Sequence, residues 1–228
     1  MTDVVVQLEL TNGLDGHQLR MQPREVILAG YTGRDRAAVQ RHIDELAAEG
    51  IAPPPQVPAL YRGLPGGVQV GGDLPAGQGW CSGEVEYVLL VIGEETYVGV
   101  GSDHTDREVE QASVEASKQA FPKIISSTVW PLEALLPEWD QLVLRSWIGE
   151  GDARRLYQEG PISLIMAPPE LLHLAAPDGP PDGLVVFSGT VAIAERAPAS
   201  GLCHFEGELC RPNGEILARC AYSYRAAP

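Results

Sequence analysis

Residues 84–101 read EVEYVLLVIGEETYVGVG, and this stretch gives the clearest strand signal in the sequence. Residues 84–92 and 96–101 are rich in β-branched and aromatic side chains, which predicts two strands. The first of these segments is almost continuously apolar after its first residues, as expected of a strand that is buried on both faces. The two strands are close enough in sequence to pair as a hairpin.

Two carboxylates lie at the start of the first predicted strand, in Glu84-Val85-Glu86. Alternate residues of a strand share a face, so Glu84 and Glu86 are expected side by side. Such a pair repels unless a cation lies between its members, and an all-oxygen ligand set suits Mg²⁺ or Mn²⁺ better than zinc. Asp103 follows the second strand and would approach Glu84 in a hairpin. A solvated strand face is the alternative interpretation of this motif.

The remaining pattern predicts a mixed, β-rich α+β fold with a few short helices. The clearest helix is residues 35–49, where apolar side chains recur at helical spacing, and residues 107–118 are a second candidate. We expect residues 1–58 to form N-terminal strands and a helix that would act as a lid. Residues 59–228 are expected to form a β-rich catalytic domain. The alternative is that the two segments fold as a single domain. Further strands are predicted at residues 4–10, 25–30, 141–148, 184–193, 203–210 and 216–224, and a loop at residues 63–79.

Acidic residues outnumber basic ones by 31 to 16, and the formal net charge of the 228-residue chain is -15. This excess argues against nucleic acid or an anionic membrane as a partner, because both are polyanions. It fits a small partner or a bound cation. The first ten residues lack the features of a signal peptide, and no apolar run reaches the roughly 18 residues of a spanning helix. The cysteines form no C-x-x-C pair, which is ordinary for a cytoplasmic protein.

Two other sites have side chains suited to chemistry. His42 and Glu45 are three residues apart on the predicted helix and so share a face. The carboxylate would orient the imidazole and raise its basicity, which suits a general base, although an exposed pair is the alternative. Gly189-Thr190 follows an apolar strand, where the hydroxyl and backbone N–H either bind a carboxylate or simply form a turn. Lys123, taken alone, is a surface lysine.

The order of these segments resembles that of the fumarylacetoacetate hydrolase family. The similar segments are residues 26–31 with the H-x-x-E helix at 42–45, the Pro-rich residues 53–61, the E-x-E strand at 84–86, residues 101–108 for G-x-N-D-x-[ST]-x-R-D, Lys123, and the late Gly189-Thr190. The resemblance covers most of residues 26–224. Departures include Ser102 for Asn, Glu108 for Asp, a longer spacer before the helix and a missing Pro-Leu-Gly-Pro signature. The chain therefore resembles a divergent bacterial branch of the fumarylacetoacetate hydrolase family.

The resemblance implies a role for each site residue and a fold of β-sheets or a β-roll, like the C-terminal domain of that family. It implies Mg²⁺ or Mn²⁺ held by metal ligands Glu84, Glu86 and Asp103; catalytic residues His42, Glu45 and Lys123; and substrate-binding residues Arg107, Gly189 and Thr190.

The activity implied by the resemblance is C–C bond hydrolysis in a small anionic 2-oxo acid of the acylpyruvate or fumarylacetoacetate type. The reaction would use a metal-stabilised enolate and a water activated by His42. A decarboxylase, hydratase or isomerase is the alternative within enzymes, because one fold supports several reactions. A non-catalytic small-molecule binder is a further alternative. The family also implies a homodimer, and we expect a cytoplasmic location.

Overall fold

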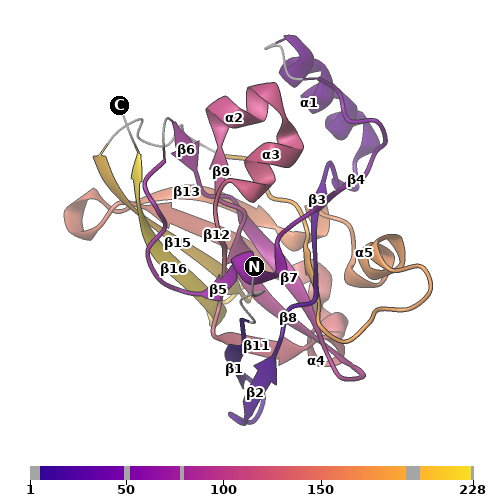
Figure 1. The fold of residues 1–228 in the computed structure, drawn as a ribbon. Helices are drawn as coiled ribbons and strands as arrows, with labels where there is room; N and C mark the ends of the chain where they lie inside the picture. Colours follow the sequence, from indigo (N-terminus) through magenta and orange to yellow (C-terminus); the bar gives the residue numbers. More distant parts are fainter. Residues whose placement is uncertain (1–5, 49–51, 78–79, 194–200, 227–228) are drawn as a thin grey trace.

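The computed structural model describes residues 6–48, 52–77, 80–193 and 201–226 of the chain, which form a β-rich molecule with short helices (Figure 1). The larger sheet contains β1 (Leu8–Asn12), β2 (Gln18–Met21), β3 (Glu25–Gly30), β4 (Ala59–Arg62), β5 (Val68–Val70), β7 (Val85–Ile92), β8 (Glu95–Ser102), β10 (Lys123–Ile125), β11 (Thr128–Pro131) and β14 (Leu184–Phe187). The second sheet contains β12 (Val143–Ile148), β13 (Arg155–Pro161), β15 (Gly201–Cys210) and β16 (Ile216–Ala226), and a separate pair joins β6 (Cys81–Ser82) to β9 (Thr105–Asp106). The predicted mixed, β-rich fold is confirmed.

The helices are short and lie between strands. They are α1 (Arg36–Ala48), α2 (Arg107–Ala112), α3 (Val114–Gln119), α4 (Leu132–Leu135) and α5 (Pro168–Ala175), with 3-10 turns η1 (Pro65–Gly67), η2 (Leu136–Gln141), η3 (Gly151–Ala153) and η4 (Ile162–Leu164). Figure 1 shows α2 and α3 together and α1 at the outer edge of the molecule. Within the described ranges, no helix combines the length and the apolar character that crossing a membrane requires.

The β7–β8 hairpin lies in the middle of the larger sheet, whose strand order is β2-β1-β11-β8-β7-β14-β3-β4. Its register runs from Ile92 opposite Glu95 to Val85 opposite Ser102, so the loop has two residues. Gly93 in that loop has a φ of +63°, which glycine adopts at little steric cost. The register leaves Glu84 and Asp103 as the next facing positions beyond the last pair.

The two faces of β7 contact different hydrophobic clusters. Val85, Tyr87, Leu89 and Val91 pack in the cluster that includes the inner side chains of the four-stranded sheet. Val88 and Leu90 belong to a second cluster. Its buried members come from nearly every strand of the larger sheet, so this sheet curls around the cluster. Glu86 precedes Val88 on the same face, and its carboxylate therefore lies at one end of the curled interior.

Several predicted elements differ in extent from the structure. The helix predicted over residues 107–118 is broken at Ser113, whose extended backbone ends α2 and whose hydroxyl accepts the Ala116 N–H at the start of α3. The strand predicted to run to residue 193 ends at Phe187, because the chain turns at Gly189 (φ +86°). The predicted loop contains β5, which pairs in parallel with β10.

The two predicted segments, residues 1–58 and 59–228, both contribute strands to the larger sheet. β1 pairs with β11 and β3 pairs with β14, and β4 begins at the predicted boundary and pairs with β3. Parts of three predicted elements, at residues 4–5, 49 and 78–79, lie outside the described residues.

Gly101 allows β8 to approach its neighbours closely, and a side chain there should destabilise the fold. A Cβ at this position would lie 2.7 Å from the Ile124 carbonyl oxygen and 2.8 Å from Val88 Cγ2. We expect Gly101→Ala to lower the free energy of unfolding by about 1–3 kcal/mol, measured by urea denaturation. Gly67→Ala is the control, because its Cβ would meet only Leu64 Cβ at 3.4 Å. Equal losses in both variants would contradict this packing.

Candidate metal centre

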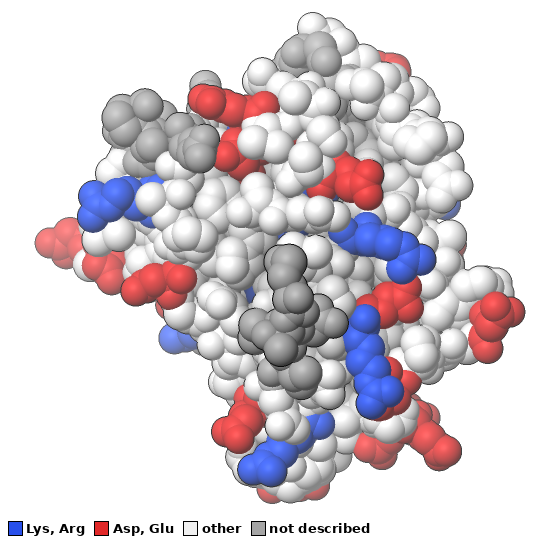
Figure 2. Space-filling view, viewed as in Figure 1, with Lys and Arg blue, Asp and Glu red and all other residues white. Residues whose placement is uncertain are grey.

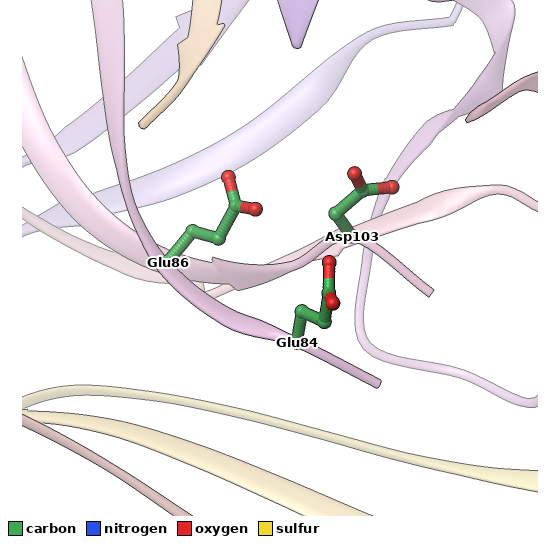
Figure 3. A group of neighbouring side chains, drawn as sticks. All are labelled: Glu84, Glu86 and Asp103. Atoms are coloured by element: carbon green, nitrogen blue, oxygen red, sulfur yellow. The ribbon is translucent and has the colours of Figure 1, made fainter. Parts of the chain in front are cut away.

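Three carboxylates from the β7–β8 hairpin converge on one point. Glu84 directly precedes β7, Glu86 is its second residue and Asp103 follows β8, and the three side chains extend to the same side (Figure 3). One oxygen from each lies within 4.8 Å of the others. The Asp103 N–H donates to the Glu84 carbonyl at 3.1 Å, which continues the hairpin pairing by one step. The register alone thus brings three acidic groups together.

Glu86 is one of the two fully buried carboxylates of the group. Only 2% of the residue is exposed. Burial, and then the negative charge of Asp103, raise its pKa well above the usual glutamate value, while Lys118 opposes this shift. The Gly189 N–H donates to Glu86 Oε2 at 2.9 Å. Without a cation in the centre, the charged form of Glu86 is therefore disfavoured.

Asp103 is held between two lysine side chains. Its Oδ2 pairs with Lys118 Nζ, and its Oδ1 lies 2.6 Å from Lys123 Nζ. Burial works against ionisation, but the two ammonium groups outweigh it and bring the pKa of Asp103 to about 2. The β8–β10 register places Ile124 opposite Ser102, so Lys123 is the next residue beside Asp103. Lys123 also donates to the His104 carbonyl at 3.0 Å.

Arg107 fixes the outer carboxylate of the group. It is the first residue of α2, which Asp106 caps through the N–H groups of Glu108 and Val109. Its guanidinium lies 2.6 Å from Glu84 and 2.8 Å from Glu110, and its Nε donates to Ser82 Oγ. Burial opposes the charge of Arg107, but the two glutamates raise its pKa above the usual arginine value. The substrate contact expected of Arg107 stays a prediction.

Gly189 and Thr190 hold the start of β7. The Gly189 N–H binds Glu86, and a Cβ at this residue would lie 2.5 Å from Thr32 Oγ1. The Thr190 hydroxyl donates to the Val85 carbonyl at 2.7 Å and accepts from Gln158. Both residues thus lie beside the carboxylates, and their predicted binding of a substrate carboxylate remains untested.

His42 and Glu45 lie on α1 and share a face, as predicted. His42 Nδ1 lies 3.9 Å from Glu45 Oε2, and the side chains are 60% and 75% exposed. The His42 ring centroid lies 6.4 Å from that of Tyr31. Within the described part of the chain, no hydrogen bond or ion pair joins either residue to the three carboxylates.

Lys118 is also part of the centre and was not predicted from the sequence. Lys118 lies on α3, is 8% exposed as a residue, and also approaches Glu84 Oε2 at 3.9 Å. Burial lowers its affinity for a proton, but Asp103, Glu84 and Glu86 outweigh this and raise its pKa. One sequence signal was present: the chain has fourteen arginines and only two lysines, 118 and 123. Both lysines contact Asp103.

The donor set fits a hard divalent cation. All three ligands are carboxylates, and oxygen ligands are what Mg²⁺ and Mn²⁺ prefer. Asp103 Oδ1 is buried with an ionic neighbour but no well-aligned hydrogen bond. The fold and the site together define a curled β-sheet protein with a three-carboxylate candidate metal centre at the end of its interior.

Solved structures of the fumarylacetoacetate hydrolase family share this fold. A family protein from yeast is 16% identical, with a TM-score of 0.63 over 90% of this chain and 94% of its own. Fumarylpyruvate hydrolase from Pseudomonas aeruginosa, solved with Mn²⁺ and pyruvate, is 16% identical, with a TM-score of 0.67 over 100% and 98%. A 2-keto-3-deoxy-D-arabinonate dehydratase is 14% identical, with a TM-score of 0.63 over 90% and 74%. The expected fold is thus confirmed.

The family of the chain is shown by its sequence. Residues 29–222 match the model of a family described as a protein of unknown function, DUF2848, and the chain belongs to that family. No curated protein matches the sequence. The family match spans all the site residues named above.

Two carboxylate-to-amide changes should shift the stability of the metal-free protein in opposite directions. Glu86→Gln removes a disfavoured buried charge and keeps an oxygen for the Gly189 N–H, so we expect it to stabilise the fold at pH 7. Asp103→Asn leaves two buried ammonium groups without their carboxylate and should cost about 3–5 kcal/mol. Urea denaturation in the presence of a chelator measures both.

The pH dependence of these two effects follows from the direction of each pKa shift. The pKa of Asp103 is depressed from 3.8 to about 2, so its stabilisation is present above about pH 4 and fades as the pH falls toward 2. The pKa of Glu86 is raised, so the advantage of Glu86→Gln appears only as the pH rises above the ordinary glutamate range. Shifts of the same sign in both variants at pH 7 would contradict these assignments.

Proposed function

We propose that this chain is a divalent-metal-dependent hydrolase that cleaves a C–C bond in a 2-oxo acid of the acylpyruvate or fumarylacetoacetate type. The observation that carries the proposal is the convergence of Glu84, Glu86 and Asp103 within 4.8 Å. It is supported by the fold, because a protein of this fold was solved with Mn²⁺ and pyruvate. Mg²⁺ or Mn²⁺ would be held by these three carboxylates.

The local charge favours an anionic substrate once a divalent ion is present. The three carboxylates are balanced by Arg107, Lys118 and Lys123, and Glu110 adds one further negative charge. A bound divalent ion would add two positive charges to this acidic centre, although the chain has a net charge of -15. Figure 2 shows acidic and basic side chains scattered over one face. Attraction of a small anion would thus depend on the field of the centre itself.

The partly exposed side of the centre is where a substrate would enter. The side chains of Glu84 and Arg107 are each 13% exposed, whereas Asp103 is 2% exposed. Tyr31 and Tyr61 are partly exposed; burial raises the pKa of each hydroxyl, and the charges of Lys118 and Glu110 modify both shifts. Two aromatic hydroxyls within range of these charges would suit a substrate with carbonyl and carboxylate oxygens.

In the proposed reaction, His42 accepts a proton from water while Glu45 orients the imidazole. The hydroxide would attack the carbonyl carbon distal to the 2-oxo acid group, and the C–C bond of this adduct would break to give a carboxylic acid and the enolate of the 2-oxo acid. The proton taken up by His42 would then pass to the carbon of that enolate. A bound divalent ion supplies Lewis-acid stabilisation of the negative charge that develops on the keto oxygen. Lys123, Gly189 and Thr190 would position the anionic end of the substrate. Because His42 is exposed on α1, it would act by closing over the centre as a lid residue.

A lyase is the second candidate function, and the exposure of His42 and Glu45 favours it. Decarboxylation, hydration or isomerisation of a 2-oxo acid does not require a water activated by this pair. A 2-keto-3-deoxy-D-arabinonate dehydratase shares the fold. A homodimer and a cytoplasmic location complete the proposal; four free, buried cysteines support the latter.

Removal of one ligand should remove metal binding. We expect Glu84→Ala to abolish Mg²⁺ and Mn²⁺ binding measured by calorimetry, and Asp103→Ala to do the same if it folds. Glu115→Ala is the matched control, because it removes an exposed carboxylate from neighbouring α3. Wild-type affinity in the Glu84 variant would show that the site assignment is wrong.

His42→Ala should separate the two candidate reactions. We expect it to slow hydrolysis of a panel of acylpyruvates by about 10²-fold or more, because general-base catalysis contributes roughly that factor. Decarboxylation of oxaloacetate should remain largely unchanged. His17→Ala, which changes another exposed histidine, is the control. An equal loss of both activities would remove His42 from the role of activating water.

A further inference from the structure

Lys118 occupies the space between two of the proposed metal ligands. Its ammonium group pairs with Asp103 Oδ2 and lies 3.9 Å from Glu84 Oε2, so it faces both carboxylates at once. Lys123 lies on the other side of Asp103, 2.6 Å from Oδ1. The two lysines therefore bind different oxygens, and only Lys118 bridges toward a second ligand.

A compact ammonium group can act as a built-in cation in a carboxylate centre. Lysine carries a point charge with three donors, whereas the planar guanidinium of arginine is larger and binds in a fork. The basic residues elsewhere in the chain are all arginines, and both lysines are at this centre. Asp103 Oδ2 cannot bind Lys118 Nζ closely and also coordinate a divalent ion at about 2.1 Å without strong repulsion between the two cations.

The surroundings of the two lysines differ in how freely each can move. Lys123 begins strand β10, donates to the His104 carbonyl and has a side chain that is 4% exposed. Lys118 is near the end of the short helix α3, and its side chain is 10% exposed. A cavity of about 130 Å³ is lined by both lysines together with Leu64, Gly67, Gln119 and Phe121, among others. The lower exposure of Lys123 and its bond to the His104 carbonyl leave Lys118 as the freer of the two side chains.

We propose that Lys118 is an intrinsic competitor of the divalent ion: its ammonium neutralises Glu84 and Asp103 in the metal-free protein and leaves Asp103 when the metal binds. This inference rests on the proposed metal centre and goes beyond it, because it assigns the specificity of that centre partly to a residue that is not a ligand. Metal binding then requires displacement of the ammonium, which lowers affinity and excludes weakly bound monovalent cations.

The first test compares Mn²⁺ binding by wild type and Lys118→Met in calorimetry after removal of metal. We expect the variant to bind Mn²⁺ at least tenfold more tightly, which corresponds to about 1.4 kcal/mol. In the absence of metal the same variant should melt at a lower temperature than wild type, and saturating Mn²⁺ should close that gap. Arg62→Met controls for loss of one exposed positive charge. Lys118→Gln serves as the second variant if Lys118→Met does not fold.

The presence of only two lysines gives a direct spectroscopic readout. Protein labelled with ¹⁵N at lysine Nζ should show two slowly exchanging ammonium signals, of which Lys118→Met removes one. Addition of diamagnetic Mg²⁺ should abolish the Lys118 signal by releasing it to solvent, while the Lys123 signal persists.

The outcomes separate this inference from the proposed function. If wild type binds Mn²⁺ and Lys118→Met binds it equally or more weakly, the competition is wrong and the metal centre stands. A Lys118 signal that is unchanged by saturating Mg²⁺ also overturns the competition alone. If neither protein binds Mn²⁺ or Mg²⁺, the proposed metal centre fails, and the role of Lys118 fails with it.

Discussion

The cross-strand register of the β7–β8 hairpin is the constraint on which the rest of the site depends. It places Asp103 opposite Glu84, and the strand period places Glu86 on the same face. Three buried like charges are unfavourable unless cations or donors balance them. The structure supplies these from different parts of the chain. The starts of α2 and β10, the end of α3 and the turn after β14 all serve the same electrostatic requirement.

Local sequence patterns predict the part of the site that lies on one hairpin. Strands 84–92 and 96–101 follow from composition, and the approach of Asp103 to Glu84 follows from pairing them as a hairpin, whose loop has two residues in the structure. Lys118 was not predicted, because its place depends on the break at Ser113, which reorients α3. The partners of Arg107 were also not predicted, since a long side chain near several carboxylates gives no pairing from sequence alone. The scarcity of lysine was the overlooked compositional signal.

Tertiary pairings account for the remaining differences. β5 lies in a Gly- and Pro-rich segment that has no strand pattern of its own, and its parallel partner β10 is more than fifty residues away in sequence. Strand propensity is decided largely by such context. Gly189 lies two residues after Phe187, the last residue of β14. The chain turns there with a positive φ, and the Gly189 N–H donates to Glu86. Gly189 therefore both forms the turn at the strand end and positions the proposed metal ligand Glu86. The Gly-Thr motif alone does not distinguish these two roles.

The central claim is that a divalent ion and a 2-oxo acid bind together at the three carboxylates. The most direct measurement is the melting temperature of wild type with oxalate alone, with Mg²⁺ alone and with both, because a ligand that binds the folded state raises it. We expect oxalate to raise the melting temperature only when Mg²⁺ is present. An equal rise with oxalate in the presence of a chelator would contradict the chelate and indicate a plain anion-binding protein.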